Sequence, residues 1–177
     1  KLILTVDGID VNQADNDGTT PLYQAANKGH VDIAKLLIKA GAIANQAQNN
    51  GSTPLYEAAA NGHVDLIKVI IEADGDVNQA RTTSGATPLF IASQKGHTDI
   101  VAILLGTPGI QINQHNNTKQ TPLSIASQKG QTEVVRLLLQ QPNIDVNKGE
   151  EGWPPLKVAK HFKHTEVIQL LKNAGAQ

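Results

Sequence analysis

The tripeptide Thr-Pro-Leu recurs along the chain at a nearly constant interval, and this period constrains the fold more than any other feature. Residues 20–37 read TPLYQAANKGHVDIAKLL, and similar phrases begin at Thr53, Thr87 and Thr121. The prolines of these phrases and of a fifth, divergent one are spaced by 33, 34, 34 and 33 residues; they are Pro21, Pro54, Pro88, Pro122 and Pro155. Such a period is typical of proteins built from stacked repeats.

An asparagine before each phrase is a second, independent marker of the same period. It follows an apolar-x-apolar element, and its spacings are 33, 33, 35 and 34 residues; the positions are Asn12, Asn45, Asn78, Asn113 and Asn147. One-residue insertions and deletions fall around these asparagines and not inside the phrases. Each phrase is therefore predicted to be an intact structural unit.

Each phrase predicts two short antiparallel helices. A Thr before a Pro is a favoured helix N-cap, because Pro loses nothing at the first helical position. A Gly about two turns later suits a left-handed C-cap, and an acidic residue in the first turn of the second helix complements its dipole. These residues are Thr20, Thr53, Thr87 and Thr121; Gly29, Gly62, Gly96 and Gly130; and Asp32, Asp65, Asp99, Glu133 and Glu166.

The apolar residues of each helix fall on one face, which a single hairpin leaves uncovered. With 40% hydrophobic residues but only five aromatics, the core must consist of Ala, Leu, Ile and Val. An alanine at one place in all five units lets neighbouring helices approach to the low end of the usual 8–10 Å or so. We expect the core face of the first unit to be Leu22, Ala25 and Ala26 on one helix and Ile33, Leu36 and Leu37 on the other.

The order T-P-L-x-x-A, G-H, L-L and G-A-x-x-N at about 33 residues resembles the ankyrin repeat. The resemblance covers essentially the whole chain and implies an all-α ankyrin-repeat solenoid of stacked helix-turn-helix hairpins joined by β-hairpin-like loops. It predicts one continuous domain, 1–177: the end of a truncated repeat with its hairpin (1–19), four repeats (20–52, 53–86, 87–120 and 121–153) and a C-terminal capping repeat (154–177).

Departures from the family pattern concern the histidine that usually follows T-P-L and the last unit. Aromatic residues replace this histidine in three units, where packing between repeats is favoured over an exposed binding stripe. In the last unit lysines occupy places that earlier units fill with aromatic or small residues, which is how a terminal repeat keeps its outer face polar. The aromatic residues are Tyr23, Tyr56 and Phe90; the lysines are Lys157, Lys160 and Lys163.

Composition excludes several classes of function. The 15 basic residues are scattered and balanced by 16 acidic ones, so we expect no nucleic-acid partner. No Cys is present for disulfides or thiolate metal sites, and no apolar window reaches the 18 or so residues of a membrane span. We expect a soluble, monomeric piece of a longer protein, with the cytoplasm as the default location.

Histidines recur in the G-H element, and we predict a structural role for them. Equivalent side chains in stacked repeats lie about 10 Å apart, much too far to share a zinc ion. His161 and His164 share a helix face at an i, i+3 spacing, but this metal hypothesis lacks a third ligand. No nucleophile elbow, P-loop or dinucleotide fingerprint occurs, so no catalytic, metal or cofactor residues are expected. The G-H histidines are His30, His63, His97 and His164.

Several asparagines match modification patterns. Asn50 and Asn116 open N-x-[ST] sequences on predicted hairpin tips, where coincidence is favoured because the chain is rich in Asn, Ser and Thr. Asn78 and Asn147 end D-V-N sequences similar to ankyrin hairpins in which Asn is hydroxylated, and only the resemblance supports this hypothesis.

The resemblance also implies that hairpin tips and the exposed sides of the first helices form a concave face that binds a protein or peptide. For each polar residue the alternative is an ordinary solvated side chain. The residues carried over to this face are Asn16, Asp17, Thr19, Asn27, Lys28, Asn49, Asn50, Ser52, Asn61, Ser84, Gln94, Lys95, Asn117, Thr118, Gln120, Gln128, Lys129, Glu150, Glu151, Trp153, His161 and Phe162.

Trp153 and Phe162 stand out on this predicted face, because interface energy concentrates in a few aromatic or Arg anchors. For Trp153 the favoured alternative is packing over the end of the core beside Pro154 and Pro155. The leading functional hypothesis is a non-enzymatic scaffold for protein–protein interaction. The second is a recruiting arm of a larger enzyme or effector whose catalytic part lies outside this sequence.

Overall fold

The computed structural model describes residues 9–177, and within this range ten short helices form and no strand does. The first eight residues of the predicted truncated repeat lie outside the described residues. The helices are α1 (Pro21–Lys28), α2 (Val31–Lys39), α3 (Pro54–Asn61), α4 (Val64–Glu72), α5 (Pro88–Lys95), α6 (Thr98–Leu105), α7 (Pro122–Lys129), α8 (Thr132–Leu139), α9 (Pro155–His161) and α10 (Thr165–Asn173).

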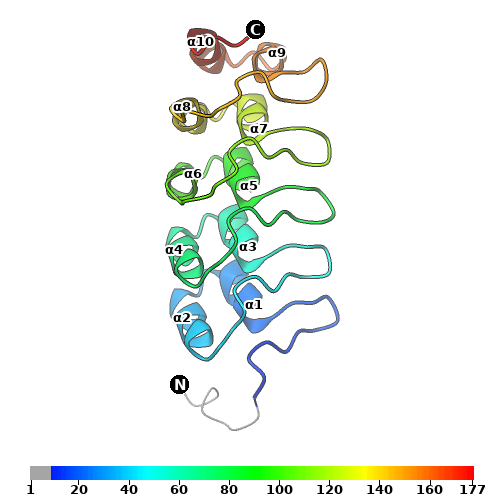
Figure 1. Cartoon of the computed structure of the whole chain (residues 1–177), viewed down its shortest axis with the longest axis vertical. Helices are drawn as coiled ribbons and strands as arrows, with labels where there is room; N and C mark the ends of the chain where they lie inside the picture. The colour runs from blue at the N-terminus through cyan, green and yellow to red at the C-terminus, as the bar shows by residue number, and fades with distance from the viewer. Residues whose placement is uncertain (1–8) are drawn as a thin grey trace.

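The helices form two parallel columns, which confirms the predicted all-α solenoid. Each odd-numbered helix packs on the next odd-numbered helix, each even-numbered helix packs on the next even-numbered one, and the two helices of a hairpin contact each other (Figure 1). The connecting loops all project to the same side of the stack. Within residues 9–177 they form turns and a single isolated bridge, Glu150 to Trp153, in place of regular strands.

The first helices begin as predicted. The Oγ1 atoms of Thr20, Thr53, Thr87 and Thr121 each accept a hydrogen bond of 3.1 Å from the backbone N–H three residues later. Pro occupies the first helical position each time, and the helix ends at a glycine with φ between 68° and 80°. Local capping therefore fixes the length of each first helix at two turns.

The glycine at the end of each first helix is required for a second reason. The ring of His63 lies over Gly29, where a Cβ atom would come within 2.8 Å of the histidine Cε1. His63 Nε2 is 3.2 Å from the Asn27 carbonyl oxygen, and His97 and His164 contact carbonyls of the preceding first helix in the same way. For these three histidines the predicted structural role is confirmed; His30, in the first described unit, is exposed.

The fifth unit lacks this glycine. Lys163 stands in its place with φ of 60°, a left-handed conformation that disfavours a side chain. Within the described residues no histidine ring lies over this position, so the lysine meets no steric conflict. The substitution fits a turn over which no histidine ring packs, and the capping role of this repeat stays a prediction.

The core confirms the predicted alanine contacts and corrects two positions. Ala25 and its four counterparts are all 3% exposed or less, between neighbouring first helices. Ile33 and Leu36, predicted to face the core, are 49% and 41% exposed, whereas Leu66, the counterpart of Ile33 in the next repeat, is fully buried. Leu66 lies in α4, which packs against α2 of the repeat before it, whereas within the described residues no second helix precedes α2 to cover Ile33.

The second marker of the period is an inter-repeat clamp. Asn45 donates through Nδ2 to the Asp74 carbonyl at 2.9 Å and accepts at Oδ1 from the Asp76 N–H at 2.7 Å. Asn12, Asn78 and Asn113 bind the following repeat in the same two-sided way. One side chain thus hydrogen-bonds both a backbone carbonyl and a backbone N–H of the equivalent loop in the next repeat, which holds adjacent repeats in register.

The three aromatic residues that replace the histidine after T-P-L are buried. This confirms the prediction that they pack between repeats and do not form an exposed binding stripe. Tyr23, Tyr56 and Phe90 are no more than 6% exposed. Burial and, secondarily, the neighbouring Glu57 carboxylate of the next repeat raise the pKa of Tyr23. Burial likewise raises the pKa of Tyr56, against the opposing effect of the Arg81 guanidinium, which lies 6.0 Å above its ring.

We expect Asn78→Ala to lower the free energy of unfolding by about 1–2 kcal/mol, because two net hydrogen bonds between repeats are lost. Asn143→Ala is the matched control, because Asn143 is exposed and takes part in the clamp only through its backbone carbonyl, which the substitution keeps. Urea unfolding monitored by circular dichroism measures both variants. Equal losses in the two variants would contradict the clamp.

The two tyrosines are the only ones in the chain, so absorbance near 295 nm reports their ionisation alone. Both folded pKa values are raised above the usual value of about 10. An unfolded chain therefore loses these protons first, and the stability they confer is present below pH 10 and lost as the pH rises above it. We expect the native titration to lie above that of the urea-unfolded chain, and Tyr23→Phe with Tyr56→Phe to flatten the alkaline loss of stability. Coincident titrations in the two states would refute the burial effect.

Candidate functional site

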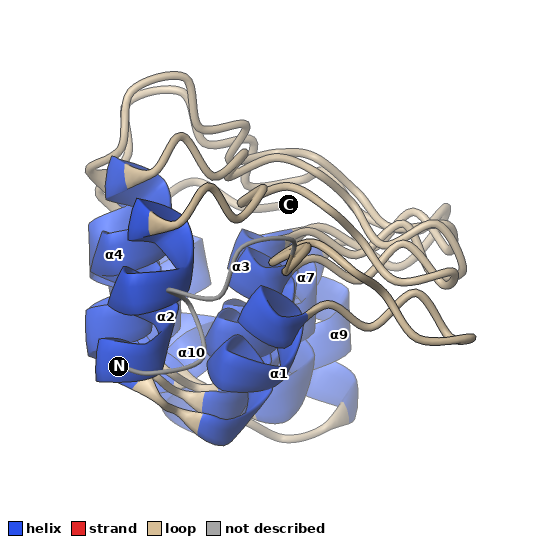
Figure 2. Ribbon diagram, turned by 90° about the horizontal axis from the view of Figure 1, so that it is seen from below, coloured by secondary structure: helices blue, strands red, loops and turns tan. Residues whose placement is uncertain are grey.

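The predicted binding face lies where the loops extend past the odd-numbered helices. Seen along the stack, the loops and the odd-numbered helices form the two arms of an angle (Figure 2). Each repeat contributes one hairpin tip and the last turn of one helix, so equivalent residues form rows along the solenoid. A face of this kind offers an extended surface to a partner.

Most of the predicted contact residues reach solvent, and one does not. Exposed residues are Asn16, Asp17, Lys28, Asn49, Asn61, Lys95, Asn117, Thr118, Lys129, Glu150, Glu151, Trp153, His161 and Phe162. Half-buried residues are Thr19, Asn27, Asn50, Ser84, Gln94, Gln120 and Gln128. Ser52 is fully buried, so the prediction that it lies on this surface is wrong.

Ser52 is buried because its hydroxyl is hydrogen-bonded to a carboxylate inside the stack. Its Oγ donates to Glu57 Oε1 at 2.7 Å, and Glu57 Oε2 accepts from Asn27 Nδ2 at 3.3 Å. Glu57 occupies a position where the next three repeats carry Ile or Val, so a carboxylate here needs polar partners. The sequence analysis missed Glu57; a charged residue at a position that is apolar in later repeats was the available signal.

The hairpin tips also bind one another. Asn49 donates from its backbone to the Asp17 carbonyl and from Nδ2 to the Asn16 carbonyl, and Asn117 binds Ser84 and Thr83 equivalently. Asn50 and Asn116 accept backbone N–H groups of their own turns. Several polar residues of the predicted face therefore hold the loops together, which limits the surface that is free to vary with a partner.

An exposed aromatic cluster occupies the C-terminal end of the face. The Trp153 and His161 rings meet edge to face with centroids 5.3 Å apart, and the His161 and Phe162 rings do so at 4.9 Å. Trp153 is 38% exposed and Phe162 46% exposed. The favoured prediction that Trp153 packs over the end of the core is therefore wrong: the ring lies outside the core, against His161 and below the Lys157 ammonium, 4.9 Å from the ring centroid.

The aromatic cluster lines an open cavity of about 290 Å³. Its walls come from the loop before α7, the end of α7, the loop before α9 and the end of α9. Six of its seven lining residues were predicted as contact residues and only Val158 was not; the six are Gln120, Gln128, Glu150, Trp153, His161 and Phe162. The structure thus brings together residues that are spread over 43 positions of sequence.

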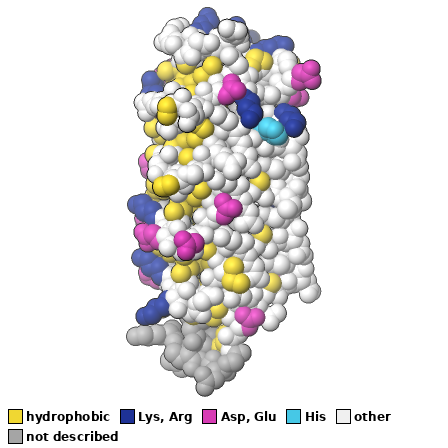
Figure 3. All heavy atoms as spheres, in the orientation of Figure 1, with side chains coloured by type: hydrophobic (Ala, Val, Ile, Leu, Met, Phe, Trp, Pro, Cys, Tyr) yellow, Lys and Arg dark blue, Asp and Glu magenta, His cyan; other side chains and the backbone are white. Residues whose placement is uncertain are grey.

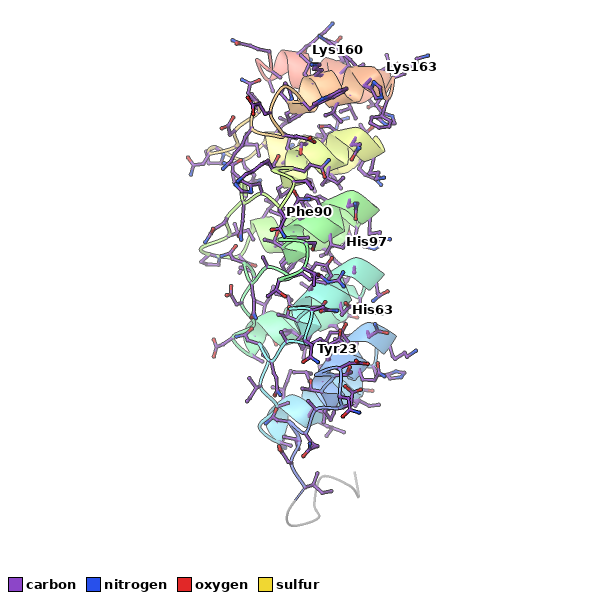
Figure 4. The ribbon with its side chains drawn as sticks, turned by 90° about the vertical axis from the view of Figure 1, so that its right-hand side faces the viewer. Tyr23, His63, Phe90, His97, Lys160 and Lys163 are labelled. Atoms are coloured by element: carbon purple, nitrogen blue, oxygen red, sulfur yellow. The ribbon has the colours of Figure 1, made fainter. Side chains whose placement is uncertain are left out.

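Figure 4 looks onto the face from the side of the hairpin tips. Tyr23 and Phe90 lie between the loops and the first helices, His63 and His97 lie at the turns where first helices end, and Lys160 and Lys163 lie at the C-terminal end of the stack. The turn histidines are thus separated by a repeat. The Nε2 atom of His164 is hydrogen-bonded to the Gln128 carbonyl. The described residues contain no group of three His, Asp or Glu side chains placed to hold a metal.

Charge is distributed unevenly over the surface. On the side of the stack shown in Figure 3, few charged side chains lie over the loops, and most gather along the edge formed by the even-numbered helices and near the C-terminal end. Arg136 of α8 joins Glu133 at 3.4 Å and Glu166 of α10 at 3.2 Å on that outer side. None of the helices in residues 9–177 is long and apolar enough to cross a membrane.

Comparison with known proteins agrees with this architecture. The family model "Ankyrin repeats (3 copies)" matches residues 1–81, 44–116, 73–150 and 89–177. A segment of 41 residues is 44% identical to cortactin-binding protein 2 of Ornithorhynchus anatinus; it covers 23% of this chain and 2% of that protein. Because overlapping matches extend from the first residue to the last, the chain belongs to the ankyrin-repeat family.

Proposed function

We propose that this chain is a non-catalytic scaffold that binds a partner protein or peptide through its concave face. Ankyrin repeats are protein–protein interaction modules, and the family is generally non-catalytic. The observation that carries the proposal is the cavity at the C-terminal end of the face, where two exposed aromatic side chains flank polar groups. Aromatic residues at the centre of a contact area typically dominate binding energy.

The polar residues around the cavity fit a supporting role. Gln120 Nε2 is 3.4 Å from Gln128 Oε1, so the two amides that line the cavity also position each other. Such groups add complementarity around an apolar anchor, whereas the anchor supplies most of the affinity. The buried Tyr23, Tyr56 and Phe90 have no part in the contact because the next repeat covers them.

The relative supports the class of function and not the partner. Its name, cortactin-binding protein 2, says that it binds cortactin, but this chain matches only 2% of its length. The chemistry of the partner is therefore argued from the surface residues of this chain and not from the relative. The second hypothesis, a recruiting arm of a larger enzyme, would use the same surface and stays a prediction.

The test is affinity capture from lysate of the native cell with Trp153→Ala and Phe162→Ala combined. We expect the recovered partner to bind this variant roughly 30-fold or more weakly, since loss of a hot spot costs about 2 kcal/mol or more. Both side chains are largely exposed, so the melting temperature should change little. Quantitative mass spectrometry followed by titration calorimetry measures the difference.

The matched control is Asp65→Ala with Lys68→Ala on the outer side of α4. These residues are exposed and form a surface ion pair of 3.8 Å, which contributes little to stability. The control should retain the full affinity. A partner that binds both double variants as tightly as the parent chain would refute the role of the aromatic cluster.

A further inference from the structure

We propose that the C-terminal half of the concave face binds an extended acidic peptide segment whose apolar side chain enters the cavity between Trp153 and Phe162. This inference rests on the proposed function and adds the chemistry of the partner. Three features carry it: the size of the cavity, the row of lysines that leads to it, and the spacing of the repeats.

The cavity fits one large apolar side chain. Its volume of about 290 Å³ is at the lower limit of small-ligand pockets, which span about 300–1,000 Å³. Val158 contributes an apolar surface, and the Trp153 and Phe162 rings contribute two apolar walls. A single anchoring side chain on an extended segment matches this shape, whereas the convex surface of a folded domain would reach only the rim.

A row of cations runs toward the cavity along the ends of the first helices. Lys95 ends α5, Lys129 ends α7, and Phe162 holds the equivalent place after α9. Lys129 directly follows Gln128, which lines the cavity. The row therefore presents cation, cation and aromatic ring in successive repeats. Asn61 interrupts it at α3, so this charge pattern belongs to the C-terminal half of the stack.

The acidic groups at the cavity lie on its opposite side. Glu150 lines the cavity from the hairpin, and Glu151 is exposed beside it. The loop side carries Glu150 and Glu151 together with the exposed Lys119, whereas the helix ends present Lys95 and Lys129. Carboxylates of a ligand are attracted to the lysines at the helix ends, which favours that side of the face for an acidic segment.

The repeat spacing sets the spacing of the acidic residues. Packed helices lie about 8–10 Å apart, so Lys95, Lys129 and Phe162 are separated by a step of that size. A polyproline II segment returns to the same face every three residues, which is about 9 Å at its rise of 3.1 Å per residue. The row therefore matches Asp or Glu at positions three and six residues from the apolar anchor, in one chain direction or the other.

The experiment is a selection with a random 12-residue peptide library displayed on phage. Binders to the parent chain are depleted on the variant Trp153→Ala with Phe162→Ala, so that only peptides that need the cavity remain. We expect an apolar or aromatic residue with Asp or Glu enriched at distances of three and six. Trp153 is the only Trp in the chain, so its fluorescence reports occupancy by Trp-free synthetic peptides directly.

A second variant tests the lysine row. Lys95→Glu with Lys129→Glu should weaken the binding of the selected peptides at least tenfold and reverse its dependence on NaCl concentration, because the screened attraction is replaced by a screened repulsion. Lys35→Glu with Lys39→Glu makes the same change of charge on exposed residues of α2, away from this face, and should retain binding within about twofold.

The outcomes separate the inference from the proposed function. Cavity-dependent peptides with no acidic enrichment, or equal weakening by the two charge variants, would overturn the inference and leave the scaffold function supported. Failure to select any cavity-dependent peptide would overturn the inference as well. In that case the capture experiment with Trp153→Ala and Phe162→Ala still decides whether the aromatic cluster binds a folded partner.

Discussion

The whole structure depends on the fact that a single pair of these short helices cannot bury its own apolar face. Two-turn helices are far too short to be stable alone in water. Each therefore needs the equivalent helix of the next repeat, and alanines at the contact allow the close approach. Stability is then a sum of contacts between neighbours, and every repeat must present nearly the same residues to the next.

Polar contacts between repeats impose the same requirement. His63, His97 and His164 reach back to a carbonyl of the preceding first helix and cover its terminal glycine, and Gln131 does the same in the fourth unit. Four of the five periodic asparagines each bind a carbonyl and an N–H of the loop one repeat later; they are Asn12, Asn45, Asn78 and Asn113. Because these bonds recur with the period, most of the repeated residues are committed to stacking. Under the proposed function, specificity comes from residues that change between repeats, and these include the aromatic cluster of Trp153, His161 and Phe162.

Local chemistry made much of this fold predictable. The Thr-Pro caps and terminal glycines fix helix bounds without tertiary contacts, and the period dictates stacking. The errors arose where a neighbour decides the environment of a side chain. Ser52 occupies a hairpin but is drawn inward by Glu57, and Trp153 lies beside two prolines but turns toward His161. The period of the asparagines was visible in the sequence. That each side chain bonds both a carbonyl and an N–H of the next loop could not be predicted, because it depends on how neighbouring loops are aligned.

The repeated residues hold the stack, and we propose that the variable residues of the C-terminal concave face bind the partner. Hydrogen–deuterium exchange of the chain, free and saturated with a captured partner, tests it most directly. We expect new protection in the loop before α9, at the end of α7 and at the end of α9, with little change in α2, α4 and α6. Protection confined to those even-numbered helices, with none around Trp153 and Phe162, would contradict it.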